Sequence, residues 1–227
     1  MNPVAENTRS GADDVAEVAC VITEAGLVEG FGHVSTRCEG GFLITPTLPM
    51  DSLSPDDVLE LDAEGRFSSS IDPVGNVPLE AAMHAAIYAS REDINAICRT
   101  HSPAVVLAGA RGEVPPLVHG LGGLAGEITY CDRLDLVTEE QAGAEVAAAL
   151  GTSDGILLRG NGSLSVGKDA GEAAVRAYYL EERCLFGSQT DSDRAFNEEQ
   201  LAARSKWFAA ESMRAWVWLR WRYAGKK

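Results

Sequence analysis

Histidine is the side chain best suited to proton transfer or metal binding near neutral pH, and this chain has only four. They are His33, His84, His101 and His119. A lone histidine is more often a satisfied structural residue than a ligand, so each needs support from its neighbours. None lies in a polar tail, and each stands beside a glycine, a proline or a helix with a nearby carboxylate. The segments around them are therefore the first candidates for a site.

Glu80 and His84 stand four residues apart in a segment, Leu79–Ser90, that predicts a helix. This spacing places both side chains on one helix face. In the structural interpretation, the helix dipole favours a carboxylate at the N-terminal end and the histidine is simply buried. In the functional interpretation, Glu80 is a general acid/base or a metal ligand.

Arg99 and His101 come at the end of a short apolar segment, 95–100, that predicts a buried strand. Side chains two apart on a strand share one face. Charged groups in such surroundings need a partner or a role. Pro103 then predicts the first turn of a helix. Further on, segments 155–159 and 163–166 predict two strands joined by a Gly-Asn-Gly turn that carries Asn161.

His33 follows a glycine turn. Apolar residues at helical spacing over 13–29 predict a helix that ends at Gly30 and Gly32, before a strand over 34–37. Backbone N–H groups at such a turn can hold an anion. An ordinary helix-to-strand turn is the equally weighted alternative.

Alternating elements around these segments predict the fold class. Further strands are expected at 42–45, 58–62 and 128–130, and further helices at 138–150, 170–186 and 197–223; a capping box from Thr138 to Gln141 and a loop over 72–78 are also expected. The strands come in hairpin-like pairs. We therefore expect an α/β protein with a mixed, mostly antiparallel sheet and helices on its faces.

Composition narrows the class of protein. The net charge of −15 disfavours nucleic acid and anionic membranes as partners. Five scattered cysteines, without a C-x-x-C pair, predict reduced thiols in a reducing compartment. No apolar run is long enough for a membrane span, and the N-terminus lacks the apolar region of a signal peptide. We expect a cytoplasmic protein.

Five motifs in order resemble the class II aldolase/adducin family, from about Ala12 to about Gly187. They are the glycine turn of segment 26–37, the Ile-Thr-Pro-Thr stretch of segment 43–47, the Glu80-x-x-x-His84 helix, the His101 strand and the Leu-Leu-x-x-Asn-Gly stretch of segment 157–162. Each motif is short, but their order and intervals make the resemblance specific.

The resemblance implies a three-layer α/β/α fold, often a homotetramer with its site between subunits. Many such proteins hold a divalent metal on three histidines, and a glutamate matching Glu80 is the acid/base. The metal stabilises the enolate left when a carbon–carbon bond breaks. Because decarboxylation needs the same stabilisation, aldolases and decarboxylases can share the site.

The sequence departs from this pattern at the metal. Arg99 and Asn161 occupy two of the three positions of ligand histidines. A protonated arginine is no ligand, and asparagine offers a carbonyl oxygen that suits Mg²⁺ or Mn²⁺ more than Zn²⁺. The resemblance therefore implies at most a weak site for Mn²⁺, Mg²⁺ or Zn²⁺ on His101, Glu80 and Asn161.

The sequence also departs from sugar-phosphate members, because His33, Leu48, Pro78 and Leu79 replace most of a phosphate cradle. The turn is closer to the family's decarboxylase branch. We expect a carbon–carbon lyase for a small, unphosphorylated carboxylated or carbonyl substrate. The expected catalytic residues are Glu80, Tyr130 and His119, and the expected substrate-binding residues are Gly32, His33, Ser35, Arg37, Thr47 and Arg99. Of these, Arg99 is expected to bind a substrate carboxylate with its planar fork.

Alternatives remain open. They are a non-catalytic, adducin-like interaction domain, a sugar-phosphate aldolase or epimerase, and another chemistry on the same fold. We expect a flexible N-terminus over 1–11, the main domain over 12–190, and an aromatic-rich C-terminal helix within 191–227. That helix is expected to pack on the domain or on a neighbouring subunit of a homotetramer, or to cover an apolar pocket.

Overall fold

The computed structural model describes residues 3–67 and 75–224. Its sheet has seven strands in the order β3-β2-β1-β4-β7-β6-β5. The strands are β1 (His33–Cys38), β2 (Gly41–Ile44), β3 (Leu59–Asp62), β4 (Ala96–Thr100), β5 (Ile128–Cys131), β6 (Gly155–Leu158) and β7 (Ser163–Gly167). Only the β5–β6 pair among them is parallel. The predicted mixed, mostly antiparallel sheet is therefore confirmed.

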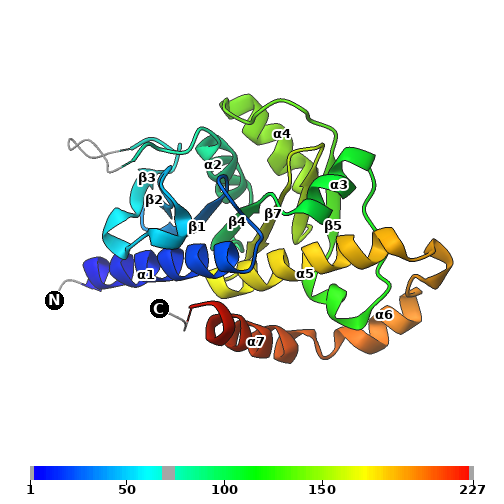
Figure 1. Cartoon of the computed structure of the whole chain (residues 1–227). Coiled ribbons are helices and arrows are strands. Elements are labelled where there is room, and N and C mark those ends of the chain that lie inside the picture. Colours follow the sequence, from blue (N-terminus) through cyan, green and yellow to red (C-terminus); the bar gives the residue numbers. More distant parts are fainter. Residues whose placement is uncertain (1–2, 68–74, 225–227) are drawn as a thin grey trace.

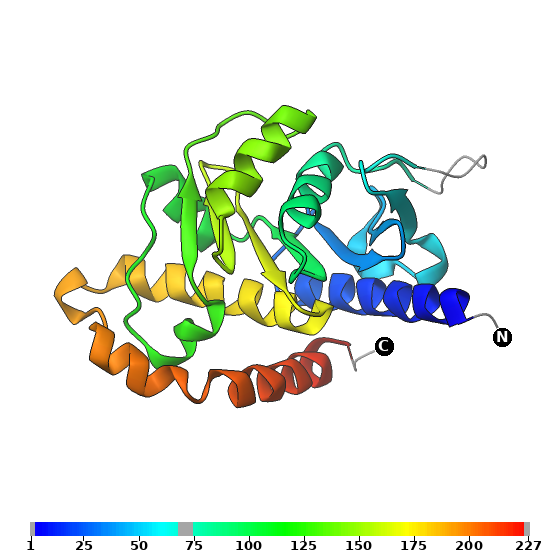
Figure 2. The same cartoon turned by 180° about the vertical axis from the view of Figure 1, so that it is seen from behind.

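Helices cover both faces of this sheet (Figure 1). The helices are α1 (Pro3–Glu24), α2 (Ala81–Ser90), α3 (Pro103–Arg111), α4 (Glu140–Leu150), α5 (Ala170–Gln189), α6 (Glu198–Ser205) and α7 (Phe208–Leu219). On one face α1 and α5 lie side by side, and α2 and α4 cover the other; Figure 2 shows the same layers from behind. This arrangement confirms the predicted three-layer α/β/α fold.

Side chains along the central strand β4 point alternately to the two faces of the sheet, so neighbouring residues pack under different helix layers. Ile97 packs into the apolar core beneath α2 and α4, whereas Ala96 and Cys98 pack into the core beneath α1 and α5. Arg99 is two residues after Ile97, so its side chain lies on the α2 face. A guanidinium is thus placed in a layer built otherwise from apolar side chains, and it must find its partners there.

Several predicted boundaries were wrong. Helix α1 begins at Pro3 rather than Asp13, so helix occupies most of the segment predicted as a flexible terminus. The capping box predicted from Thr138 is not formed, because α4 starts at Glu140 with Glu139 at its N-cap and no side-chain cap. The loop predicted over 72–78 lies partly outside the described residues. Domain limits at 12 and 190 stay predictions.

The predicted single helix over 197–223 is also wrong, because the chain breaks it after Ser205. Helix α6 has a capping box from Asn197 to Gln200, and α7 ends in a π-helical turn, Arg220–Ala224. Ala215 and Leu219 of α7 join the core beside α5, while Met213, Val217 and Trp221 are 66 to 72% exposed. The tail therefore packs on the domain with one face and leaves an apolar face open.

None of the helices formed by residues 3–67 and 75–224 is long and apolar enough to cross a membrane.

Candidate active site

A pocket of about 700 Å³ opens where the α1–β1 turn, the N-terminus of α2 and the end of β4 meet. Five residues predicted for the site line it: His33, Thr47, Glu80, His101 and Asn161. They come from positions up to 128 residues apart in the chain (33 to 161), so the fold alone brings them together. The rest of the wall is mainly apolar and includes Leu27, Val28, Phe31, Leu79, Pro103 and Leu136.

Two glycines allow the loops to approach the end of β4 closely. A side chain at Gly32 would meet Val28 and come within 2.9 Å of the carbonyl oxygen of Arg99. Gly162 has a positive φ of 72°, and a side chain there would collide with the carbonyl oxygen of Thr100. Gly32 thus serves close packing and lines the hollow next to the pocket, which His33 and Thr47 share.

Beneath the pocket floor, Arg99 and Glu80 form a buried ion pair. Nη2 of Arg99 lies 3.3 Å from Oε2 of Glu80, with the arginine side chain 0% and the glutamate side chain 8% exposed. Nη1 of Arg99 also donates to the carbonyl oxygens of Thr100 (3.0 Å) and Ser163 (3.4 Å). Because Glu80 lines the pocket and Arg99 does not, the carboxylate lies between the guanidinium and the space for a substrate.

The ion pair changes the interpretation of Arg99. The predicted bidentate contact with a substrate carboxylate requires an accessible fork, and this guanidinium has no exposed surface. Its Nε and Nη2 atoms have no hydrogen-bond partner among the described residues. Arg99 therefore acts on the pocket through Glu80, as a fixed positive charge behind the carboxylate.

His101 is held by both ring nitrogens. Nδ1 lies 3.1 Å from the carbonyl oxygen of Phe31, which can only accept, so Nδ1 carries a proton. Nε2 lies 3.2 Å from Oδ1 of Asn161. Burial, and secondarily the charge of Arg99, lowers the pKa of His101. In the neutral ring Nε2 is an acceptor, so this contact strengthens when His101 gains a proton or when Asn161 turns its amide NH₂ toward the ring.

His33, in the pocket wall, and His84, buried behind it, lie against each other with ring centroids 5.6 Å apart. Burial, with a smaller effect of Arg99, lowers the pKa of His84 to about 3. Burial and then the neighbouring charges lower the pKa of His33 well below its ordinary value. Both imidazoles are thus neutral at pH 7. Among the described residues near the pocket floor, the guanidinium of Arg99 supplies the permanent positive charge.

Ser35 connects this layer to α2 instead of lining the pocket. Its hydroxyl lies 2.7 Å from Nδ1 of His84 and 2.8 Å from the hydroxyl of Tyr88. Arg37 is also held away from the pocket, because it donates to the carbonyl oxygens of Ile94, Tyr88 and Arg91. These contacts favour structural roles over the predicted substrate binding.

Tyr130 and His119 do not line the pocket either. The hydroxyl of Tyr130 donates to Oδ1 of Asp132 at 2.9 Å. The ring of His119 packs edge-on against Phe186, with centroids 4.7 Å apart. Within one chain, the structure thus does not bring these two predicted catalytic residues to Glu80. Their catalytic roles stay predictions.

Sequence reasoning missed the residue that anchors the turn after β4. Glu181 of α5 accepts hydrogen bonds from the hydroxyl of Ser102 (2.7 Å) and from the backbone N–H groups of Ala104 and Val105 (both 3.0 Å). It holds the start of α3, and hence the segment that carries His101. No local pattern marks Glu181, because its partners lie almost eighty residues earlier. Leu136, in the pocket wall, likewise carries no signal in the sequence.

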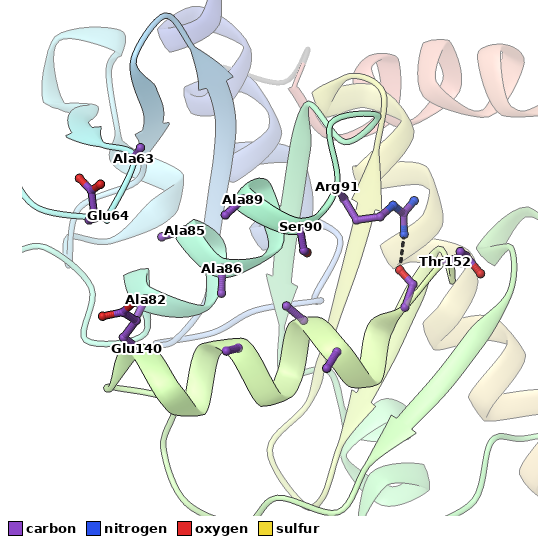
Figure 3. Close-up of a pocket in the computed structure, with 14 residues that line it drawn as sticks. Ala63, Glu64, Ala82, Ala85, Ala86, Ala89, Ser90, Arg91, Glu140 and Thr152 are labelled. Atoms are coloured by element: carbon purple, nitrogen blue, oxygen red, sulfur yellow. Dashed lines mark hydrogen bonds between the residues drawn. The ribbon is translucent and has the colours of Figure 1, made fainter.

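A second hollow, of about 880 Å³, lies between α2 and α4 (Figure 3). Alanines of both helices line it, with Glu64 and Glu140 near its edge. Arg91 at its far end donates to the carbonyl oxygen of Gly151 at 2.7 Å and to Asp93. This hollow is larger than the pocket at Glu80, but its lining, as far as the structure describes it, includes no histidine, cysteine or hydroxyl-rich cluster. The chemistry is concentrated at the pocket of Glu80.

The donor set can be tested for a divalent metal. His101 has the orientation of a ligand, with Nδ1 donating to a backbone carbonyl and Nε2 directed at Asn161. Glu80 does not fit, because its carboxylate already pairs with a buried cation. Among the described residues, no group of three or more His, Cys, Asp or Glu side chains is placed to hold a metal ion. The residues present therefore do not fit the metal that the resemblance implies.

Comparison with known proteins identifies the family. Residues 13–186 match the Class II Aldolase and Adducin N-terminal domain, and the chain belongs to this family. The family is typically metal-dependent. The predicted family and fold are thus confirmed, and this result rests on most of the chain rather than on the five short motifs.

Among its relatives, the chain is 29% identical to 3,4-dihydroxyphthalate decarboxylase of Arthrobacter keyseri, over 75% of each chain. It is 30% identical to 5-methylthioribulose-1-phosphate/5-deoxyribulose-1-phosphate aldolase of Rhodospirillum rubrum, over 74% of this chain and 79% of the relative. An aldolase II superfamily protein from Pseudomonas syringae has the same fold, with a TM-score of 0.80 over 98% of this chain and 94% of that one, at 20% identity. These relatives are carbon–carbon lyases, and they include both decarboxylases and sugar-phosphate aldolases.

Proposed function

We propose that this chain is a carbon–carbon lyase of the decarboxylase type, acting on a small carboxylated substrate that carries no phosphate. The observation that carries the proposal is the composition of the pocket wall. It joins two carboxylates, Glu29 and Glu80, and two imidazoles to a mainly apolar surface, and its described lining residues include no lysine or arginine. A phosphoryl group is bound best by cationic side chains, so a wall of this composition favours a substrate without phosphate.

An apolar wall suits the loss of a carboxylate. The charged group is poorly solvated there, whereas the departing CO₂ is neutral, so the surroundings favour the direction of reaction. Phe31, Leu79 and Leu136 are exposed apolar side chains in this wall, and they suit an aromatic or other flat carbon skeleton. The similarity to 3,4-dihydroxyphthalate decarboxylase supports the same class of substrate, a hydroxylated aromatic acid.

Glu80 is the proton-transfer group in this proposal. Its carboxylate takes the proton of a substrate hydroxyl and delivers it to the carbon that bears the carboxylate. The carbon–carbon bond then breaks, CO₂ leaves, and its electron pair remains on the ring, ending as negative charge on the former hydroxyl oxygen. Water returns a proton to that oxygen. His101, His33 and Asn161 line the same space and provide hydrogen bonds to the substrate oxygens.

The experiment compares two ligand classes on two matched variants. Leu136 lines the pocket and Leu134 does not, although both are exposed leucines of one loop. Hydroxylated aromatic carboxylates and sugar phosphates are screened by thermal shift and by release of CO₂. We expect aromatic acids to stabilise and to be decarboxylated, with loss of both effects in Leu136→Asp but not in Leu134→Asp. Binding and cleavage of sugar phosphates alone would identify the chain as an aldolase of the other branch.

A further inference from the structure

We infer that the guanidinium of Arg99 takes the place of a divalent metal in this site, so that the pocket carries its own permanent cation and works without a metal ion. The inference deepens the proposed function and rests on it only for the chemical step. Its structural part concerns which cation lies behind Glu80, and that part can be tested without any substrate.

The guanidinium of Arg99 repels a second cation at Glu80. Arg99 has no exposed surface, its charge does not titrate in the physiological range, and its Nη2 atom lies 3.3 Å from the Glu80 carboxylate. A divalent ion bound to the same carboxylate would lie close to this guanidinium without water to screen the repulsion. The single negative charge of Glu80 can therefore neutralise either Arg99 or a metal ion. The fold places the guanidinium of Arg99 permanently in the layer between the sheet and α2.

The other donors around the pocket, among the residues that the structure describes, also do not form a metal-ligand set. A divalent metal needs several strong ligands at once, and here His101 is the imidazole oriented for ligation beside the amide of Asn161. His33 and His84 lie nearby, but their rings pack against each other, and Nδ1 of His84 is engaged by Ser35. The close packing of Gly162 against Thr100 leaves the Asn161 turn no room to retreat. The set is arranged around Arg99, not around a metal.

Arg99 can also supply the positive charge that the reaction needs. When Glu80 takes up a proton from the substrate, the ion pair loses its negative partner while the positive charge of Arg99 remains. The uncompensated guanidinium then stabilises negative charge that develops on a substrate oxygen next to Glu80. The Nε and Nη2 atoms of Arg99 have no other hydrogen-bond partner among the described residues, so little competes with this effect. Arg99 is thus a positioning residue that acts through Glu80.

The decisive test measures metal binding in three forms of the full chain: wild type, Asn161→His, and Arg99→His combined with Asn161→His. Protein purified without chelator is analysed for metal content, and Zn²⁺ and Mn²⁺ are then titrated by calorimetry and thermal shift. We expect substoichiometric metal and no shift in the wild type. The double variant, which completes an imidazole set beside Glu80, is expected to bind Zn²⁺ and to melt at a higher temperature with zinc.

The single variant Asn161→His is the matched control, because it adds a ligand but keeps the guanidinium. We expect no zinc binding by it. Zinc binding as tight as that of the double variant would show that Arg99 does not exclude the metal, and the inference would be wrong. Stoichiometric metal in the wild type would overturn it even if both variants failed to fold, as would a folded double variant without zinc affinity.

The chemical step has a separate readout. Once a substrate of the proposed class is found, turnover by the wild type is expected to survive excess chelator. Loss of turnover in chelator, restored by added metal, would contradict the inference and leave the lyase proposal standing. Failure to find any decarboxylated substrate would instead affect the proposed function, since the metal measurements do not depend on it.

Discussion

The buried ion pair makes a quantitative prediction for Glu80→Gln. The replacement is nearly isosteric, so from the sequence alone it is expected to leave the fold intact. The structure changes that expectation, because the amide can keep the contact with the backbone N–H of Val137 but leaves the charge of Arg99 uncompensated. Breaking a buried pair by removing one partner typically costs about 3–5 kcal/mol. For a chain of this length, that cost lowers Tm by roughly 6–20 °C.

The assay is a double-mutant cycle of Glu80→Gln, Arg99→Met and their combination, measured by urea unfolding at pH 7.5. Each single variant is expected to lose stability by the amount above. The combined variant removes both charges and is expected to be more stable than either single variant. If the stability of each single variant were within about 1 kcal/mol of the wild type, the pair would contribute no more than a surface ion pair does. That result would contradict a buried ion pair between Arg99 and Glu80.

Three further predictions concern residues around the site. The pKa of His84 is about 3 in the folded chain and near 6.5 in the unfolded chain. The stability that the neutral imidazole contributes is therefore present above pH 6.5 and is lost as pH falls toward 3, by about 2 kcal/mol at pH 5. Urea unfolding of His84→Gln should show a flatter dependence of stability on pH, and an unchanged dependence would contradict this prediction. Arg37→Lys should lower stability by about 2–3 kcal/mol, because three carbonyl contacts are lost, while leaving ligand-induced thermal shifts unchanged; weaker ligand binding would favour the substrate role instead. Val217→Glu, on the open face of α7, should shift a homo-oligomer toward monomer in sedimentation velocity. The control Leu134→Glu should leave the oligomer unchanged. A wild type that sediments as a monomer at micromolar concentration would refute the predicted oligomer.

The sheet was predictable because its strands carry strong local signals. Short segments next to glycine turns predicted β1, β2, β6 and β7 to within one or two residues, and the Gly-Asn-Gly turn predicted the β6–β7 hairpin. The helices were less predictable where packing decides their limits. The break after Ser205 follows no proline or glycine, and it lets α7 place Ala215 and Leu219 against α5. Such a break depends on tertiary contacts that the local sequence does not contain.

The sequence predicted which residues lie around the site but not which side chains contact one another. The alternation expected for this strand puts Arg99 and His101 on one face, and the family resemblance puts Glu80 in the same site. The structure places Glu80 3.3 Å from Arg99 and in the same pocket wall as His101. From the sequence, Arg99 could either reach a substrate in the pocket or pair with the carboxylate of Glu80. The choice depends on where β4 meets the start of α2, which the sequence does not show. Glu80, at the start of α2, and Arg99, on β4, are 19 residues apart in the chain (80 to 99), and the fold brings their side chains to 3.3 Å. Chain order alone does not fix a distance on that scale.

The pairing of Arg99 with Glu80, rather than with a substrate carboxylate, matters for the mechanism. An arginine fork open to the pocket would bind a substrate carboxylate tightly and so stabilise the ground state, which opposes decarboxylation. An arginine behind Glu80 has its positive charge balanced in the resting site, and the charge is freed only when the carboxylate takes up a proton. Its stabilisation then appears as negative charge develops on the substrate, which is when it accelerates the reaction. The buried position of Arg99 therefore suits the proton transfer that precedes carbon–carbon cleavage better than the exposed position expected from the sequence does.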